Sequence, residues 1–144
     1  MKRFSFGLEK VLKLRQYREQ EAKNDLGQAI GILTAIENNI KQNALVRGRA
    51  VQERFMGLDV GGQAGAFSMM AWDNYILRLE QEAQRLMEDA ARAELVVEEK
   101  RKLYLEASRE LKVMEKLKEK REGEYRKEVF AAETRELDDM WRPW

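Results

Sequence analysis

Apolar residues recur every seven positions along most of this 144-residue chain, and the repeat is interrupted once, by a glycine-rich stretch. In the first half, two rows spaced by seven start at Leu8 and at Leu12. Alternating steps of four and three place both rows on one face of a helix, which is the pattern of a coiled coil. Two further rows, from Ile76 and from Leu79, continue the repeat in the second half. The sustained repeat predicts a left-handed supercoil of two helices.

The interruption is the sequence GLDVGGQAGAF, residues 57–67, which holds four of the chain's nine glycines. A phosphate-binding P-loop needs a preceding strand and a closing Gly-Lys-Ser/Thr, whereas here the preceding residues follow the helical repeat and no lysine follows Gly65. Glycine also ends helices and makes turns. Ser68 is a suitable N-cap, with Phe67 and Trp72 spaced for a hydrophobic staple. We therefore expect a bend over residues 57–68, at which the chain reverses.

The resulting prediction is an all-α fold, in which residues 1–144 form a single long antiparallel two-helix coiled-coil hairpin. We expect the first helix over residues 8–56, the second over residues 69–138, and a frayed tail over residues 139–144. Folding about the bend places Leu12 near Lys112. The second helix exceeds the first by about 20 residues, roughly 30 Å, so its C-terminal part should overhang.

Polar residues interrupt the predicted seam, among them Arg15, Asn43 and Arg47. We expect them to fix the register of the two helices, or to extend their polar ends out of a narrow interface. The seam of the second helix becomes polar at Lys118 and Arg121, where the first helix has no residues left to pair with it.

The chain contains no cysteine and no histidine. Thiol and imidazole catalysis and the usual zinc sites are therefore excluded, and a hairpin offers no cleft that would tune paired carboxylates. We expect no enzyme activity, cofactor, metal or small-molecule substrate. The N-terminus lacks the apolar segment of a secretory signal, and no apolar run approaches the length of a membrane span. A cytoplasmic protein is expected.

The two ends of the hairpin carry the residues best suited to binding. The open end is basic, since residues 100–127 hold 11 basic and 6 acidic side chains, and a solvated charged face is the alternative interpretation there. The tip is rich in methionine and aromatic residues, which favour adaptable binding surfaces, although they could also cap the hairpin's own core. The tip candidates are Phe55, Met56, Leu58, Phe67, Met69, Met70, Trp72 and Tyr75.

The opening sequence, FSFGLEKVLKLRQYREQEAKNDLGQA, resembles the start of the FliJ family, small coiled-coil proteins of the bacterial flagellar export apparatus. That family begins with a phenylalanine pair, a Leu-x-x-Val-Leu-x-x-Arg core and a Glu–Ala run. The length, the glycine-broken hairpin and the long second helix also agree, whereas the near-neutral net charge of +1 is a departure. The residues that carry the resemblance are Phe4, Phe6, Leu8, Val11, Leu12, Arg15, Glu21 and Ala22.

The resemblance implies a non-enzymatic role in type III protein export, similar to the central stalk of a rotary ATPase. It implies as partners the export ATPase and its regulator, the cytoplasmic domain of the export gate, and export chaperones. It also implies a location at the cytoplasmic face of the inner membrane. On this analogy the open end would enter the ATPase ring, and the tip or the middle of the rod would meet the gate. The composition of the tip makes it the candidate surface for the gate or the chaperones. The residues expected at the ring are Phe4, Phe6, Leu8, Val11, Leu12, Arg15 and Arg18.

Other functions stay open at this point. The equivalent stalk protein of a virulence secretion system would share the fold and the mechanism. A hairpin that binds RNA would use the basic end, but the interleaved acids and a pI of about 7.9 argue against nucleic acid. A dimerisation module would join two hairpins in a four-helix bundle. The terminal WRPW matches a peptide that recruits eukaryotic corepressors, but without a DNA-binding domain we interpret it as a frayed end.

Overall fold

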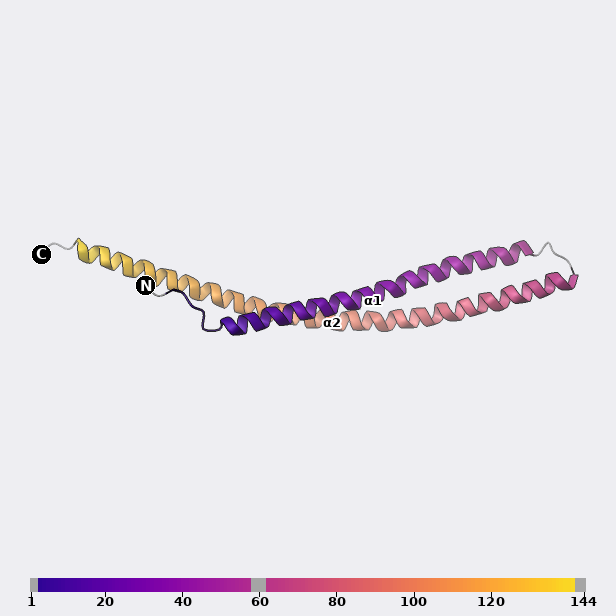
Figure 1. Cartoon of the computed structure of the whole chain (residues 1–144), viewed down its shortest axis with the longest axis horizontal. Coiled ribbons are helices and arrows are strands. Elements are labelled where there is room, and N and C mark those ends of the chain that lie inside the picture. Colours follow the sequence, from indigo (N-terminus) through magenta and orange to yellow (C-terminus); the bar gives the residue numbers. More distant parts are fainter. Residues whose placement is uncertain (1–2, 58–61, 142–144) are drawn as a thin grey trace. The chain divides into compact units, whose positions relative to one another are not determined.

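The computed structural model of the chain contains the two helices that the repeat predicts, α1 (Glu9–Met56) and α2 (Gly62–Met140) (Figure 1). It describes residues 3–57 and 62–141, and of residues 62–64 it describes the backbone alone. Within these ranges all regular structure is helical, and the helices pack against each other, so the predicted hairpin with a longer second helix is confirmed. The chain divides into two compact units, to each of which both helices contribute. Unit 1 is Met1–Asn24 with Lys102–Trp144, and unit 2 is Asp25–Arg101.

In unit 2, α1 and α2 lie side by side and antiparallel, joined at the predicted reversal of the chain (Figure 1). The most buried apolar side chains all belong to the four predicted rows, and most of them are small. A small side chain lets two helix backbones approach closely, but it also buries little apolar area. The core is therefore a narrow seam rather than a globular interior. Its buried residues are Ala29, Ala50, Leu79, Ala83, Ala93 and Val97.

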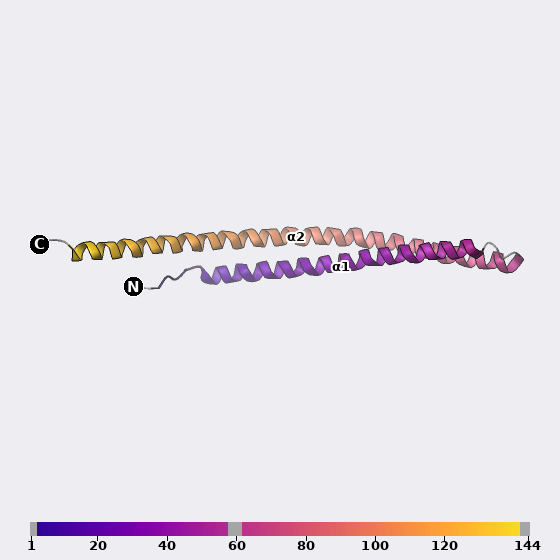
Figure 2. The same ribbon diagram turned by 90° about the horizontal axis from the view of Figure 1, so that it is seen from above.

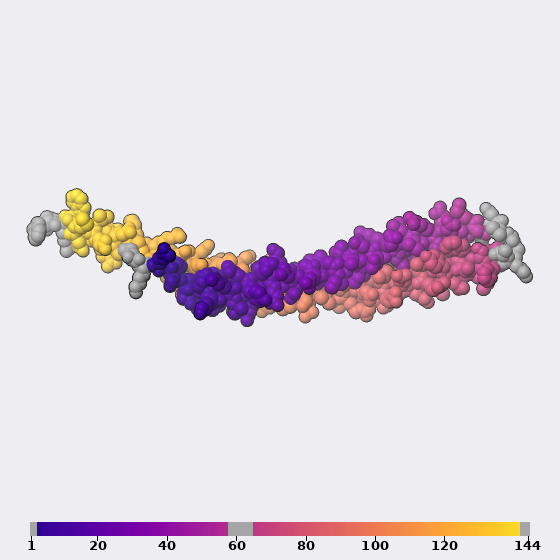
Figure 3. Space-filling view, in the orientation of Figure 1, coloured from indigo at the N-terminus to yellow at the C-terminus, as the bar shows by residue number. Residues whose placement is uncertain are grey.

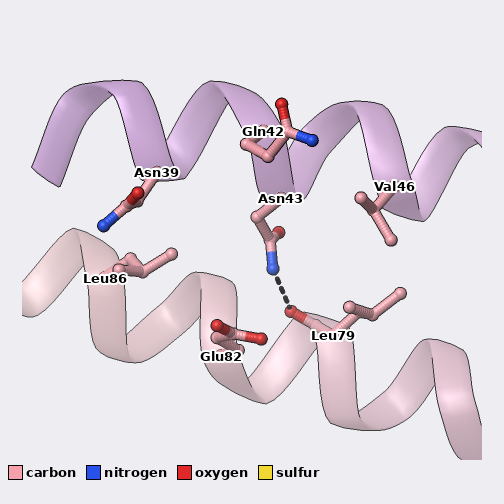
Figure 4. Close-up of a pocket in the computed structure, with 7 residues that line it drawn as sticks. All are labelled: Asn39, Gln42, Asn43, Val46, Leu79, Glu82 and Leu86. Atoms are coloured by element: carbon pink, nitrogen blue, oxygen red, sulfur yellow. Dashed lines mark hydrogen bonds between the residues drawn. The ribbon is translucent and has the colours of Figure 1, made fainter. Parts of the chain in front are cut away.

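Asn43 is a buried polar residue of this seam, with 6% of its surface exposed. Its Nδ2 donates a hydrogen bond to the carbonyl oxygen of Leu79 on the other helix, at 3.1 Å, as Figure 4 shows. Its Oδ1 accepts a hydrogen bond from Nε of Arg47, at 2.8 Å. The bond to a main-chain carbonyl forms at one alignment of the helices, and a slip would leave a buried amide unpaired. This geometry favours the register-fixing role over extension into solvent.

In unit 1, the start of α1 packs on α2 in the same antiparallel sense. Nη1 of Arg15 forms an ion pair with Glu110. Nζ of Lys118 lies 3.1 Å from Oε2 of Glu9. These two pairs bracket Leu12, which is 4% exposed and therefore lies against α2 between Glu110 and Lys118.

The second helix begins earlier than the sequence indicated, at Gly62 instead of Met69. Ser68 therefore lies inside α2 and does not cap it, and Phe67 and Trp72 do not form a staple across a helix start. Glycine within a helix costs about 1 kcal/mol relative to alanine, but the interposed alanines favour the helix and Gly65 is buried. Gly57 does not adopt a positive φ. Residues 58–61, on which the rest of the expected bend falls, lie outside the described residues.

Residues 3–8, which precede α1, form a non-helical N-terminal segment. Within unit 1 the C-terminal end of α2 continues past this segment, which confirms the predicted overhang (Figure 2). The helix ends at Met140, and the N–H of Trp141 donates to the carbonyl oxygen of Leu137 at 3.1 Å. Phe130 is 71% exposed and Met140 is 80% exposed. On the face seen in Figure 3, no other described part of unit 1 lies over residues 130–140. Of the terminal WRPW, residues 142–144 lie outside the described residues.

We predict that Asn43→Ala lowers the free energy of unfolding by about 1–3 kcal/mol, because the variant loses two hydrogen bonds inside the seam. Urea unfolding followed by far-UV circular dichroism measures the change. The control is Gln42→Ala, since Gln42 is adjacent and exposed. Equal effects of the two substitutions would show that Asn43 does not hold the seam together.

Candidate protein-binding surfaces

The two phenylalanines that precede α1 lie on α2 in unit 1. The ring centroids of Phe4 and Tyr125 are 5.5 Å apart and the rings are tilted by 44°. The guanidinium carbon of Arg121 lies 5.6 Å from the centroid of the Phe6 ring. Phe6 is 7% exposed. Contacts of these two kinds are worth about 0.5–1.5 kcal/mol each, so they hold the N-terminal segment on α2 beyond the point where α1 begins.

The junction between this segment and α1 is fixed by local hydrogen bonds. The N–H of Glu9 donates to the carbonyl oxygen of Phe6 at 3.1 Å, and the N–H of Leu12 donates to that of Leu8 at 2.9 Å. Glu9 also stands in the first turn of α1, where a carboxylate is favourable because of the helix dipole. Its ion pair with Lys118 is partly exposed and contributes about 0.2–1 kcal/mol. The helix α1 therefore begins at Glu9, directly after the non-helical residues that lie on α2.

A groove of about 400 Å³ lies beside the N-terminal segment. Charged groups from both helices border it, and the two phenylalanines form its apolar side. Nearby, Nε of Arg15 is buried and has no hydrogen-bond partner among the described residues, although Nη1 pairs with Glu110. The groove is lined by Phe4, Ser5, Phe6, Glu9, Lys118 and Glu122.

The structure divides the seven residues expected at the ring into two groups. Arg18 is exposed, whereas the other six are buried or half-buried against α2. Those six, Phe4, Phe6, Leu8, Val11, Leu12 and Arg15, therefore build the open end and expose little surface of their own.

The sequence reasoning missed an exposed surface on the same turns of α1. Leu14 is 47% exposed and Tyr17 is 67% exposed, and both lie outside the heptad rows. Lys10, Lys13 and Arg18 are exposed and lie three or four residues from them, so all five share one side of the helix. We call this surface the outer face of α1. The sequence did contain a signal for this surface, because a leucine and a tyrosine lie outside the heptad rows, between basic residues.

At the tip of unit 2, the side chains point in two directions. Met69 and Trp72 are half-buried, and the rings of Trp72 and Tyr75 meet edge to face with centroids 6.0 Å apart. Four large side chains point outward, so capping of the core explains only part of the apolar tip. Leu58, also a tip candidate, lies outside the described residues. The four, which we call the tip cluster, are Phe55 (70% exposed), Met56 (65%), Phe67 (77%) and Met70 (65%).

An ion pair between Arg54 and Asp73 joins the two helices below the tip cluster. Between these residues the sequence holds a single charged residue, Asp59. The tip is therefore almost free of charge in a chain in which 37% of residues are charged.

A second groove lies beside Asn43 and has a volume of about 290 Å³ (Figure 4). Its one ionisable group is Glu82, which has no second acid or base beside it in the lining, so the groove lacks the paired groups of proton-transfer catalysis. Across the described ranges, no three Asp or Glu side chains gather as a metal site. No helix in those ranges combines the length and apolar character of a membrane span. The groove is lined by Asn39, Gln42, Asn43, Val46, Leu79, Glu82 and Leu86.

We predict that Phe6→Ala lowers the free energy of unfolding by about 1.5–3 kcal/mol, because it removes a buried aromatic side chain that fixes the N-terminal segment. Phe130→Ala is the matched control, since Phe130 is 71% exposed on the same unit and its loss should cost less than about 0.5 kcal/mol. Urea unfolding measures both changes. Equal losses would mean that the segment is not held through Phe6.

A family model described as the flagellar FliJ protein matches residues 4–142. No curated protein and no solved structure matches the chain. The matched range includes the N-terminal segment, both helices and the tip. A match over nearly the whole chain, on two paired helices of which the second is longer, shows that this chain belongs to the FliJ family of flagellar type III export proteins.

Proposed function

We propose that the chain is a non-enzymatic, stalk-like subunit of the flagellar export apparatus. In this proposal its open end enters the ring of the export ATPase and promotes the assembly and turnover of that ring together with the ATPase regulator. The hairpin transmits the state of the ring to the export gate. Family membership supports the export role, and the finer assignment is supported by the surfaces at the two ends.

The observation that carries the ring assignment is the outer face of α1. Leu14 and Tyr17 are exposed there among three basic side chains, whereas exposed positions of a helix are usually polar. Tyrosine and arginine are enriched among the residues that dominate binding energy, and lysines around them accelerate encounter with an acidic partner. The family motif has a supporting part, because its phenylalanines and leucines hold the end of α1 on α2. A protein segment that turns or bears load inside a ring must be rigid, and these contacts keep the start of α1 fixed on α2.

The tip cluster supports contact with the cytoplasmic domain of the export gate, or with export chaperones. Methionine and phenylalanine side chains adapt to apolar grooves of different shape, which suits a surface that meets more than one partner. Contact with the gate would place the protein at the cytoplasmic face of the inner membrane.

We predict that the triple variant Leu14→Ala, Tyr17→Ala, Arg18→Ala weakens stimulation of the purified export ATPase. The concentration needed for half-maximal stimulation should rise at least about tenfold, because the variant removes the exposed anchors of the outer face. ATP hydrolysis is measured as the protein is titrated into the ATPase. Helix content should be unchanged, since none of the three side chains is buried.

The control variant is Leu45→Ala, Leu95→Ala, Arg49→Ala, which removes exposed side chains of similar kinds from unit 2. It should stimulate the ATPase as the unmodified protein does. Stimulation that survives the first triple variant would rule out the outer face as the ring contact. No stimulation by the unmodified protein would rule out the ring assignment itself.

A further inference from the structure

We propose that α2 carries a second coiled-coil surface, through which two copies of this chain associate in antiparallel orientation. The surface consists of two rows of exposed residues that are consecutive in the heptad repeat and opposite in charge. The acidic row belongs to unit 2 and comprises Gln84, Glu88, Ala91, Leu95 and Glu98, and the basic row belongs to unit 1 and comprises Lys102, Leu105, Arg109, Lys112 and Lys116.

The spacing of the two rows is that of a coiled-coil seam. Successive members are alternately three and four residues apart, which keeps each row on one side of the helix. The rows lie outside the heptad positions that pack on α1, and every member is exposed. Leu95 is 72% exposed and Leu105 is 47% exposed. Each row therefore places a leucine among polar residues at heptad spacing, which is the pattern of a weak helix-pairing surface.

The charges of the rows favour a second copy of the chain as the partner, in antiparallel orientation. The acidic row holds two carboxylates and no cation, whereas the basic row holds four cations and no carboxylate. A parallel pair would oppose each row to itself, so like charges would meet. In an antiparallel pair each row faces the opposite row of the other copy. The near-neutral net charge of +1 adds no general repulsion between copies.

One register of the antiparallel pair joins the leucines and opposes both carboxylates to cations. Each contact in it occurs twice, because a two-fold axis relates the copies. A shift by one heptad would place Leu95 opposite Lys112 or Glu98 and lose the leucine contacts. The proposed contacts between the copies are Leu95 with Leu105, Glu88 with Lys112, and Glu98 with Lys102.

The charges of the two rows are available for such contacts. In unit 1 the ion pairs between the helices use Arg15 with Glu110 and Glu9 with Lys118, none of which belongs to a row. Over residues 3–57 and 62–141, no ion pair involves a cation of the basic row. Glu98 pairs with Arg101 of the same helix at 3.2 Å, but both side chains are more than half exposed. That pair therefore leaves the Glu98 carboxylate accessible to a second copy.

The inference does not rest on the proposed function. Neither the outer face of α1 nor the tip cluster contains a residue of the two rows, so the two proposals concern different surfaces. Exposed ion pairs are weak and are screened by salt. We therefore expect a reversible association that weakens as the ionic strength rises.

The test is sedimentation equilibrium of the purified full chain over a range of concentrations, at low and at high salt. We expect a dimer at low salt. The variant Glu88→Lys, Glu98→Lys should raise its apparent dissociation constant at least about tenfold, because four attractive contacts become repulsive. The variant Lys102→Glu, Lys112→Glu should do the same. The matched control is Glu37→Lys, Glu53→Lys, which changes exposed glutamates of α1 and should associate normally.

A mixture of the two charge-reversed variants is the sharper measurement. One copy of each restores opposite charges at every reversed contact, so the mixture should form a dimer although neither variant does so alone. Cross-linking checks the register, since the chain has no cysteine of its own. Leu95→Cys and Leu105→Cys should form a disulfide with each other in a mixture. Neither should link to itself, because like positions lie about 15 Å apart along the pair.

A monomer at every concentration would overturn the inference, and so would an equal loss of association in the control. A mixture that stays monomeric, or copies of Leu95→Cys that link to each other, would also contradict it. The proposed function would stand in each case, because these measurements contain neither the ATPase nor the gate.

Discussion

The close approach of two helices along an alanine-rich seam is the constraint on which the other features depend. Alanines such as Ala29, Ala50, Ala83 and Ala93 bring the backbones together but bury little area per turn. Each turn therefore adds a small stabilisation, and the fold depends on many turns in correct alignment. Most described side chains of each helix remain exposed.

Alignment within each unit depends on a few polar contacts and not on apolar packing alone. Small apolar side chains at heptad positions look alike after a slip of seven residues, so a repetitive seam does not specify its own register. Asn43 removes this degeneracy in unit 2 by bonding to the carbonyl oxygen of Leu79. Arg15 and Glu9 perform the same task in unit 1 through Glu110 and Lys118. The polar residues that interrupt the seam thereby align the two helices within each unit.

The sequence predicted the two helices and their antiparallel pairing, because these follow from the period of the apolar rows and from the glycine-rich interruption between them. It did not predict the start of α2, since the glycines of the bend read as helix breakers although Gly62 and Gly65 are helical. The contacts of Phe4 and Phe6 with α2 were not predicted either, because a heptad pattern describes helices and gives no position for a non-helical segment. At the tip, the rows of Ile76 and Leu79 extended back by seven residues place Met69 and Trp72 inward, whereas Phe67 lies off both rows and is exposed, so this distinction was available from the period.

The exposure of the C-terminal turns of α2 determines how this end of the helix responds to temperature. Beyond Tyr125 the described side chains are largely exposed, so these turns are held by main-chain hydrogen bonds and continuity with the turns before them. An isolated peptide of about 15 residues is barely helical in water, because nucleation is unfavourable. Here nucleation is already complete, and each further residue is governed by its own propagation equilibrium. The length of α2 is consequently a temperature-dependent average, and warming shortens the helix from Met140 inward before the seam melts.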